Sequence, residues 1–170
     1  KYMKNYIGIS RDHSTSMTSI ARAAMKDYNS KIESIKTATL EEKQDTIVSV
    51  VECASKVTRV VSNSNVTKLE PMRDYRCYGM TALFDSVGDL ITQFESVPDK
   101  DNKDVSFLVM AITDGDENDS VKWNSTTLSR KIRELISTDR WTFVFRVPRG
   151  YGAKVARLGI PEGCILEWDQ

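Results

Sequence analysis

Hydrophobic positions recur along the chain with two different spacings, and these predict strands and helices in alternation. Residues 105–112 (VSFLVMAI) form an almost continuously apolar run, which is typical of a strand covered on both faces of a parallel sheet. Short runs rich in β-branched and aromatic residues predict further strands at residues 5–10, 45–53, 56–62, 141–147 and 164–168.

Apolar residues three and four positions apart predict amphipathic helices between these strands. The predicted helices lie at residues 17–36, 81–96, 125–137 and 150–158. Polar or charged connections are expected at residues 37–42, 63–80, 98–104 and 113–120, with a short turn of helix near residues 66–69.

Only Ala54 and Ser55 separate two of the predicted strands, residues 45–53 and 56–62. A parallel return needs a crossover of about a dozen residues, so these strands must form an antiparallel hairpin. The second strand mixes polar and apolar residues on both faces, as an edge strand does. The whole pattern predicts a single doubly wound α/β domain over residues 1–170. Its central sheet is mostly parallel with one antiparallel edge strand, and helices cover both faces.

Composition narrows the functional classes. The 170 residues are 40% hydrophobic and 28% charged, with a formal net charge of zero. Zero net charge argues against nucleic acid or an anionic membrane as the main partner. No apolar run reaches the ~18 residues of a membrane span.

The chain has three cysteines, an odd number at wide spacing, which does not indicate a disulfide framework. Cys53 and Cys164 lie in apolar runs and are predicted to pack as small hydrophobes. A reducing, cytoplasmic location is therefore expected, although one disulfide with a spare thiol is an open alternative.

Polar side chains stand where predicted strands end or helices begin. Asp12, Ser14 and Ser16 follow the first strand, Thr81 opens a helix, and Asp114 follows residue 112. The carboxyl ends of parallel strands meet at one edge of the sheet, where ligands of such folds bind. We hypothesise that these five side chains surround one divalent cation, Mg²⁺ or else Mn²⁺ or Ca²⁺, since Mg²⁺ prefers about six oxygen ligands. Three neutral hydroxyls would leave the ion positive enough to attract a partner's carboxylate.

Each piece has a structural alternative. Ser14 or Ser16 can cap the following helix, and Thr81 can cap the next one. Asp114 followed by Gly115 is a common turn pair. The occurrence of all three segments together, each at a strand or helix end, favours the shared site.

The three segments resemble the metal-ion-dependent adhesion site (MIDAS) of von Willebrand factor type A (vWA) domains. The first motif of that family, Asp-x-Ser-x-Ser, is matched by Asp12, Ser14 and Ser16, and Met17 follows as in many prokaryotic members. The second motif, Gly-x-Thr-x-Leu-x-Asp, is matched by Gly79, Thr81, Leu83 and Asp85. The third motif, an Asp-Gly pair after an apolar strand, is matched by Asp114 and Gly115.

This resemblance extends over essentially the whole chain. It implies that Ser14, Ser16 and Thr81 contact the metal, with Asp12 and Asp114 acting partly through water. It also implies cation-dependent protein binding through a Glu or Asp of the partner, not catalysis, and a bacterial or phage origin.

The residues around the motifs depart from the family pattern. Arg11 precedes the first Asp, where the family usually has an apolar residue, and Thr15 replaces a frequent Gly. The predicted partner-binding rim consists of His13, Thr15, Met80, Asp116 and Glu117. For the two acidic rim residues, a solvated loop is the alternative.

Two other functions are weighed against the interaction module. A metal-assisted phosphohydrolase can use the same type of sheet, but Ser14 stands where a second carboxylate would be useful, and no Lys-bearing phosphate loop is present. His13, the only histidine, would need an orienting acid and a nucleophile to act as a general base. A scaffold with a purely structural metal is the third possibility.

Overall fold

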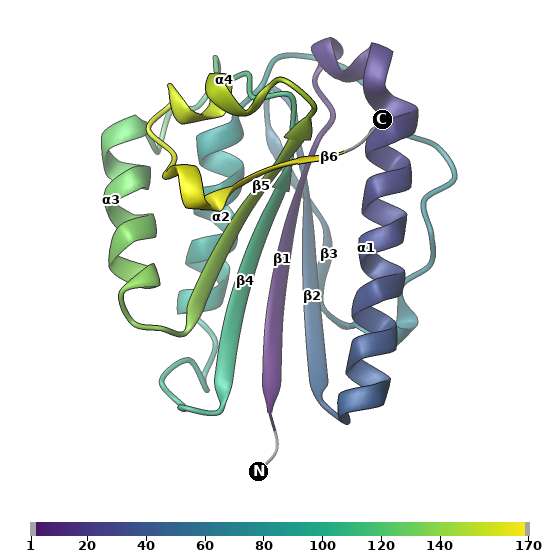
Figure 1. Cartoon of the computed structure of the whole chain (residues 1–170), viewed down its shortest axis with the longest axis vertical. Helices are drawn as coiled ribbons and strands as arrows, with labels where there is room; N and C mark the ends of the chain where they lie inside the picture. Colours follow the sequence, from purple (N-terminus) through teal and green to yellow (C-terminus); the bar gives the residue numbers. More distant parts are fainter. Residues whose placement is uncertain (1–2, 169–170) are drawn as a thin grey trace.

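The structure, a computed structural model, describes residues 3–168 as a six-stranded sheet with helices on both faces (Figure 1). The strands are β1 Lys4–Asp12, β2 Asp45–Cys53, β3 Val57–Asn65, β4 Val105–Ile112, β5 Trp141–Pro148 and β6 Ile165–Trp168. Their order across the sheet is β3-β2-β1-β4-β5-β6. Only β2 and β3 pair in antiparallel fashion, so the mostly parallel sheet with one antiparallel edge strand is confirmed.

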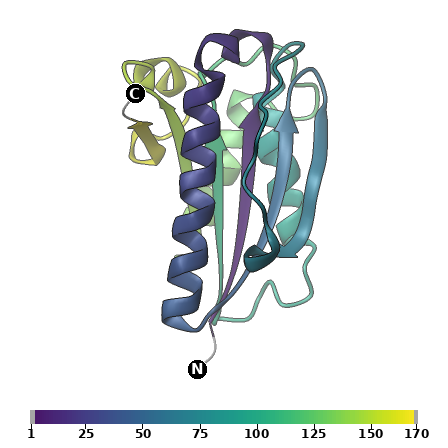
Figure 2. The same ribbon diagram turned by 90° about the vertical axis from the view of Figure 1, so that its right-hand side faces the viewer.

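Helices cover the sheet unequally. The α-helices are α1 Ala21–Glu42, α2 Leu83–Glu95, α3 Ser125–Ile136 and α4 Gly152–Ala156, and the short 3₁₀ helices are η1 Thr15–Ile20, η2 Val66–Lys68 and η3 Glu162–Cys164. Helix α1 and the short η2 lie on one face, whereas α2 and α3 cover the other (Figures 1 and 2). No helix within residues 3–168 is long and apolar enough to cross a membrane.

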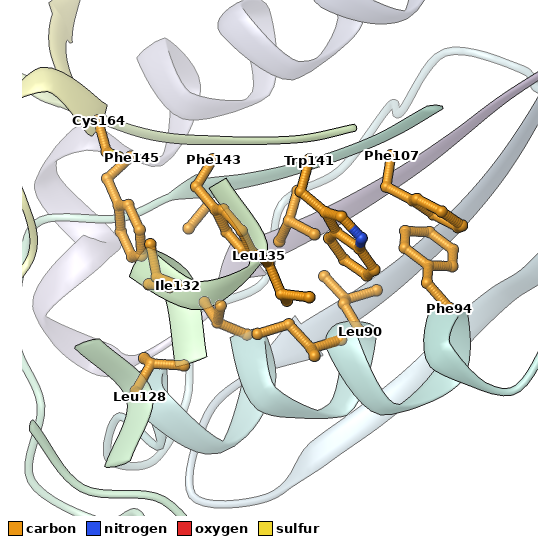
Figure 3. Packing of buried hydrophobic residues seen from close by; sticks show 14 of the residues in the cluster. Leu90, Phe94, Phe107, Leu128, Ile132, Leu135, Trp141, Phe143, Phe145 and Cys164 are labelled. Atoms are coloured by element: carbon orange, nitrogen blue, oxygen red, sulfur yellow. The ribbon is translucent and has the colours of Figure 1, made fainter. Parts of the chain in front are cut away.

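Aromatic side chains fill the face covered by α2 and α3 (Figure 3). Phe107 of β4 stacks on Trp141 of β5 with 4.4 Å between ring centroids, and Phe94 of α2 packs against both rings. Gly8 of β1 permits this packing, because a Cβ there would lie 2.9 Å from the Phe94 ring. Burial of such large apolar surfaces provides the main driving force for this layer.

Several predicted boundaries differ from the structure by one to six residues, and two of the differences have a clear structural cause. The expected loop at residues 37–42 is helical, since α1 continues to Glu42. The buried Thr39 hydroxyl pairs with the hydroxyl of Thr46 (2.6 Å), which packs the last turns of α1 against β2. Strand β3 runs to Asn65 instead of residue 62, because Asn63 adopts a left-handed conformation (φ 48°) and pairs with the hydroxyl of Ser49.

The three cysteines are free thiols. Cys53 and Cys164 belong to the hydrophobic core, as predicted, while Cys77 is half-buried.

Candidate metal centre

Strand register brings the first and third motif segments together at the carboxyl end of the sheet, the top of Figure 1. Arg11 of β1 lies opposite Ile112 of β4. The residues that follow these two, Asp12 and Thr113, are therefore neighbours as well. The Thr113 hydroxyl donates a hydrogen bond to Oδ2 of Asp12 (2.7 Å). Asp114 follows immediately, and its charge acts on Asp12.

Residues 12–16, here called the first loop, bring their hydroxyl groups close together. Oδ1 of Asp12 accepts hydrogen bonds from the backbone N–H of Ser14 (2.9 Å) and from its hydroxyl (2.6 Å). The Ser14 and Ser16 hydroxyl oxygens lie 3.1 Å apart. Ser14 occupies the N-cap position of η1, but its side chain makes no capping hydrogen bond. The capping alternative for Ser14 therefore does not hold.

Residues 75–80, here called the strap, run beside this loop. The backbone N–H of Thr15 donates to the carbonyl of Gly79 (3.0 Å), and that of Tyr78 donates to the carbonyl of His13 (2.6 Å). These bonds place the residues just before Thr81 directly against the first loop. The second motif segment thus reaches the same edge of the sheet as the other two.

Thr81 is held by the acidic loop that follows β4. Its backbone N–H donates to the side-chain Oδ1 of Asn118 (2.8 Å), and its carbonyl accepts from the N–H groups of Asn118 (2.9 Å) and Asp119 (3.1 Å). Helix α2 begins only at Leu83, with Ala82 at the N-cap position. The capping alternative for Thr81 is therefore also excluded.

The first N–H groups of α2 find their partners in the same loop. The N–H of Phe84 donates to Glu117 (2.8 Å), and that of Asp85 donates to the hydroxyl of Ser120 (2.9 Å). Glu117 is thus a capping residue at the positive end of a helix dipole. The sequence predicts a rim position or a solvated loop for Glu117, whereas in the structure its carboxylate is bonded to α2 and to Ser120.

Asp85, the last residue of the second motif, organises the end of this loop. Its carboxylate accepts the backbone N–H groups of Val121 (2.8 Å), Lys122 (3.0 Å) and Trp123 (2.8 Å). The Trp123 indole then packs on Gly88 of α2, where a Cβ would lie 2.1 Å from the ring. Trp123 is therefore a packing residue.

Burial controls the electrostatics of the site. Asp12 is fully buried and Asp114 is 4% exposed. Desolvation raises the pKa of Asp12 from 3.8 to about 6; the hydrogen bonds from Ser14 and Thr113 oppose this rise, and the negative charge of Asp114 adds to it. Two buried carboxylates, one of which feels the charge of the other, favour a cation nearby.

Among the rim residues predicted from sequence, Thr15 and Met80 are exposed. Asp116 is half-buried and forms an ion pair with Lys154 of α4. Its backbone N–H donates to Asp114 (3.1 Å), which fixes the turn after β4. The rim is therefore less acidic than the sequence suggests, because Lys154 offsets Asp116 and the start of α2 offsets Glu117.

His13 does not lie on an exposed rim, because its side chain is buried with 2% exposure. Its ring stacks on Tyr75 at 4.1 Å, and its Nδ1–H donates to the carbonyl of Arg76 (2.7 Å). Burial lowers the pKa of His13. Nε2 is enclosed without a partner among the described residues, so neither ring nitrogen is placed to take a proton from a substrate.

Arg11, the departure from the family pattern, is also buried. Its side chain lies on the α1 face of the sheet, with the guanidinium 4.7 Å from the ring centroid of Tyr28 and 3.5 Å from the Glu52 carboxylate. Glu52 in turn accepts the hydroxyl of Tyr78 (3.1 Å). Arg11 thus helps to connect α1 and β1 with the strap and points away from the face that carries Asp12.

The donor set fits a hard divalent cation. Two oxygen ligands on adjacent corners of an Mg²⁺ octahedron lie about 2.8–3.0 Å apart, given Mg–O distances of roughly 2.0–2.1 Å. The 3.1 Å between the Ser14 and Ser16 hydroxyl oxygens is close to this spacing. Across residues 3–168, no three His, Cys, Asp or Glu side chains gather where they could hold a metal. A cation at this edge must therefore depend on hydroxyl ligands.

Thr113 and Asn118 are functional candidates that the sequence analysis missed. Each makes its contacts across the fold, to Asp12 and to Thr81 respectively. The available signal for Thr113 was its position, one residue beyond the β4 strand and adjacent to Asp114. For Asn118, the tendency of Asn side chains in loops to accept backbone N–H groups was the only indication.

Comparisons with solved structures identify the fold of the chain. No family model matches the chain, and no curated protein does. A von Willebrand factor type A protein from Catenulispora acidiphila shares the fold with a TM-score of 0.63 and 16% identity, covering 99% of this chain and 39% of that one. Proximal thread matrix protein 1 from the mussel byssus, with a zinc-occupied MIDAS motif, has a TM-score of 0.55 and 16% identity over 98% of this chain and 41% of its own.

BatB from Bacteroides thetaiotaomicron, a conserved hypothetical protein, has a TM-score of 0.57 and 12% identity over 97% of this chain and 90% of its own. The chain spans about two fifths of the length of the mussel and Catenulispora structures, at 41% and 39%. The chain has the von Willebrand factor type A fold.

Proposed function

From this fold and the geometry at the carboxyl edge of its sheet, we propose that the chain is a divalent-cation-dependent protein-interaction module. The cation is held by the hydroxyls of Ser14, Ser16 and Thr81, together with the carboxylates of Asp12 and Asp114. When bound, the ion supplies a positive centre that accepts a carboxylate oxygen from a Glu or Asp of the partner.

The observation that carries this proposal is the hydroxyl pair of the first loop. Ser14 donates its hydrogen to Asp12, so the lone pairs of its oxygen are turned away from that carboxylate. The Ser16 oxygen lies 3.1 Å away at the exposed side of the same loop. Ser16 donates a hydrogen bond to the Ser14 oxygen, because Ser14 gives its own hydrogen to Asp12, and no helix cap involves the Ser14 side chain. This bond keeps the two oxygens at a spacing that suits two ligands of one octahedral cation.

Asp12 and Asn118 fix the segments that carry the hydroxyl ligands, and Asp114 adds negative charge. Asp12 accepts three hydrogen bonds and fixes the first loop. Asn118 holds Thr81 from the opposite side, so that the hydroxyl ligands come from two separately anchored segments. Asp114 provides the second buried negative charge that offsets the cation.

The charge around the site suits an acidic partner. The two ligand carboxylates offset part of the attraction of the ion for an incoming carboxylate, so further negative charge at the rim would weaken that attraction. Lys154 pairs with Asp116, and Glu117 faces the N-terminus of α2. The exposed Met80 (51%) and Tyr78 (49%) add apolar surface beside the site, which suits a protein partner.

Thermal unfolding with and without cations tests the metal site. We expect Mg²⁺ or Mn²⁺ to raise the melting temperature of the parent chain, because ligands that bind only the folded state stabilise it. Asp12→Ala and Thr81→Ala should melt cooperatively and show no such rise. Thr18→Ala, which removes an exposed hydroxyl of the same loop bonded to the Thr15 carbonyl, is the matched control and should respond like the parent. Equal cation responses in all four proteins would contradict the proposal.

Partner binding needs a separate experiment. The immobilised chain is exposed to lysate of the source organism in Mg²⁺ and in EDTA, beside immobilised Thr81→Ala. The proposal expects a protein retained by the parent only, in Mg²⁺ only, and released by excess free glutamate or acetate. A protein retained equally by Thr81→Ala or in EDTA would bind elsewhere.

A further inference from the structure

We propose that Thr113 is a positioning residue that fixes the orientation of the Asp12 carboxylate and thereby sets the cation affinity of the site. This inference rests on the proposed function and extends it to a residue outside the five ligands.

The Thr113 hydroxyl makes two hydrogen bonds, one as acceptor and one as donor. Its oxygen accepts the backbone N–H of Gly115 (3.0 Å) and donates to Oδ2 of Asp12 (2.7 Å). The residue is fully buried, and its own N–H donates to the carbonyl of Arg146 on β5 (3.1 Å). A hydroxyl has one donor hydrogen, and an ionised carboxylate can only accept, so the hydrogen of Thr113 goes to Asp12 while a lone pair of its oxygen accepts from Gly115.

The consequence for Asp12 is that both of its oxygens are held. Oδ1 accepts two bonds from Ser14 and Oδ2 accepts the one from Thr113. Without the Thr113 hydroxyl, Oδ2 of Asp12 would lose the hydrogen bond that Thr113 donates to it. The Asp12 carboxylate would then be held at Oδ1 alone and could turn more easily about its Cβ–Cγ bond. The Ser14 hydroxyl follows the Asp12 plane, so its lone pairs would no longer be held toward Ser16.

Thr113 also couples two motif segments. It stands one residue past the last residue of β4 and adjacent to Asp114, while its hydroxyl reaches the end of β1. A displacement of Asp12 relative to Asp114 would therefore strain this bond. Outer-shell partners that orient a ligand in this way typically change metal affinity by about 10–100-fold when removed.

The experiment compares Thr113→Val, which keeps the shape and removes the hydroxyl, with Thr113→Ser, which keeps the hydroxyl. The matched control is Thr46→Val at the amino end of β2. It removes another buried hydroxyl, which pairs with Thr39 (2.6 Å) far from the motif segments in the sheet. For all proteins, Mn²⁺ and Mg²⁺ affinities are measured by calorimetry, and melting temperatures are measured in EDTA.

We expect Thr113→Val to bind Mn²⁺ at least about tenfold more weakly, and Thr113→Ser to stay within a few-fold of the parent. Thr46→Val should lose melting temperature in EDTA but keep the parent affinity. Should Thr113→Val fail to fold, Thr113→Cys, whose thiol is a weaker donor, should give an intermediate loss of affinity.

Parent-like Mn²⁺ affinity in Thr113→Val would overturn the role of Thr113 and leave the proposed metal site intact. A loss in Thr113→Ser as large as in Thr113→Val would also overturn it, since rescue by the retained hydroxyl would be missing. A parent chain that binds neither cation would overturn the metal site and this inference together.

Discussion

The two ends of the central sheet bury different kinds of side chain. At the amino end, aromatic rings of β1, β4, β5 and α2 pack into one apolar layer, and Figure 3 shows the rings of Phe107, Trp141 and Phe94 within it. At the carboxyl end, hydroxyls, carboxylates, an imidazole and a guanidinium are buried next to apolar residues such as Met17 and Ile112. The buried charged groups of the sheet therefore gather at its carboxyl end, whereas the stacked aromatic rings gather at its amino end.

This contrast separates stability from the candidate function. Burying an aromatic ring is favourable, whereas burying a carboxylate costs free energy unless it is hydrogen-bonded or paired with a cation. Asp12 has three hydrogen bonds and still has a raised pKa. The amino end therefore provides stability, and the carboxyl end retains a charge that a cation would relieve.

The largest effect is expected from the apolar end. Phe94→Ala should lower the free energy of unfolding by about 3–5 kcal/mol, because it removes a fully buried ring. Denaturant unfolding in EDTA and in Mg²⁺ would measure this. The gain in stability on adding Mg²⁺ should equal that of the parent; a lost gain would show that the two ends are not independent.

A pH series examines the polar end. Well below pH 3.8 the Asp12 carboxyl is protonated in both the folded and the unfolded state. Since its folded pKa of about 6 exceeds the unfolded value of 3.8, the metal-free protein should lose stability as pH rises from about 4 to 6. By pH 7 this loss is on the order of 2–3 kcal/mol. It should be absent in Asp12→Asn.

The measurement is the difference in unfolding free energy between parent and Asp12→Asn in EDTA, across pH 4 to 7. Asp12→Asn should become the relatively more stable protein toward pH 7, and Mg²⁺ should reverse this order because it stabilises only the parent. A difference that does not change with pH would contradict the burial of an ionised Asp12.

The acidic loop provides a smaller effect. Glu117→Ala should lower the unfolding free energy by about 1–2 kcal/mol, because the N–H of Phe84 loses its acceptor at the start of α2. Glu117→Gln, which keeps an acceptor oxygen, should lose less. The loop also holds Thr81, so Mn²⁺ affinity should fall in the same order as stability. If Glu117→Ala is neutral in both measurements, the loop is merely solvated.

The smallest effect on the folded protein is expected at the rim. Met80→Ala should change the unfolding free energy by less than about 0.5 kcal/mol and leave Mn²⁺ affinity unchanged, because the side chain is 51% exposed. Its consequence should appear only as weaker retention of the captured partner in Mg²⁺. Unchanged retention would remove Met80 from the interaction surface.

Periodicity and strand order predict most of the fold. Residues 45–53 and 105–112 match β2 and β4 at both boundaries, since apolar runs and turn residues are local signals. The end of α1 was missed because it depends on the contact between Thr39 and Thr46, which no local pattern encodes.

For the candidate site as well, some features follow from local sequence signals and strand order, whereas others depend on tertiary contacts. Parallel strand ends place Asp12 and Asp114 on one edge, and this inference needs only topology. The burial of His13 depends on Tyr75, 62 positions further along the chain, and the capping role of Glu117 depends on where α2 begins. Both are tertiary contacts, so a sequence pattern assigned these residues to the rim.

The most direct measurement is calorimetric titration of Mn²⁺ into the parent and into Ser16→Ala. Ser16 is exposed, so its removal leaves the buried contacts of Asp12 and Thr113 in place. Our account predicts one Mn²⁺ per parent chain, displaced by Mg²⁺, and at least about tenfold weaker binding by a normally folded Ser16→Ala. No binding by the parent, or equal binding by both proteins, would contradict it.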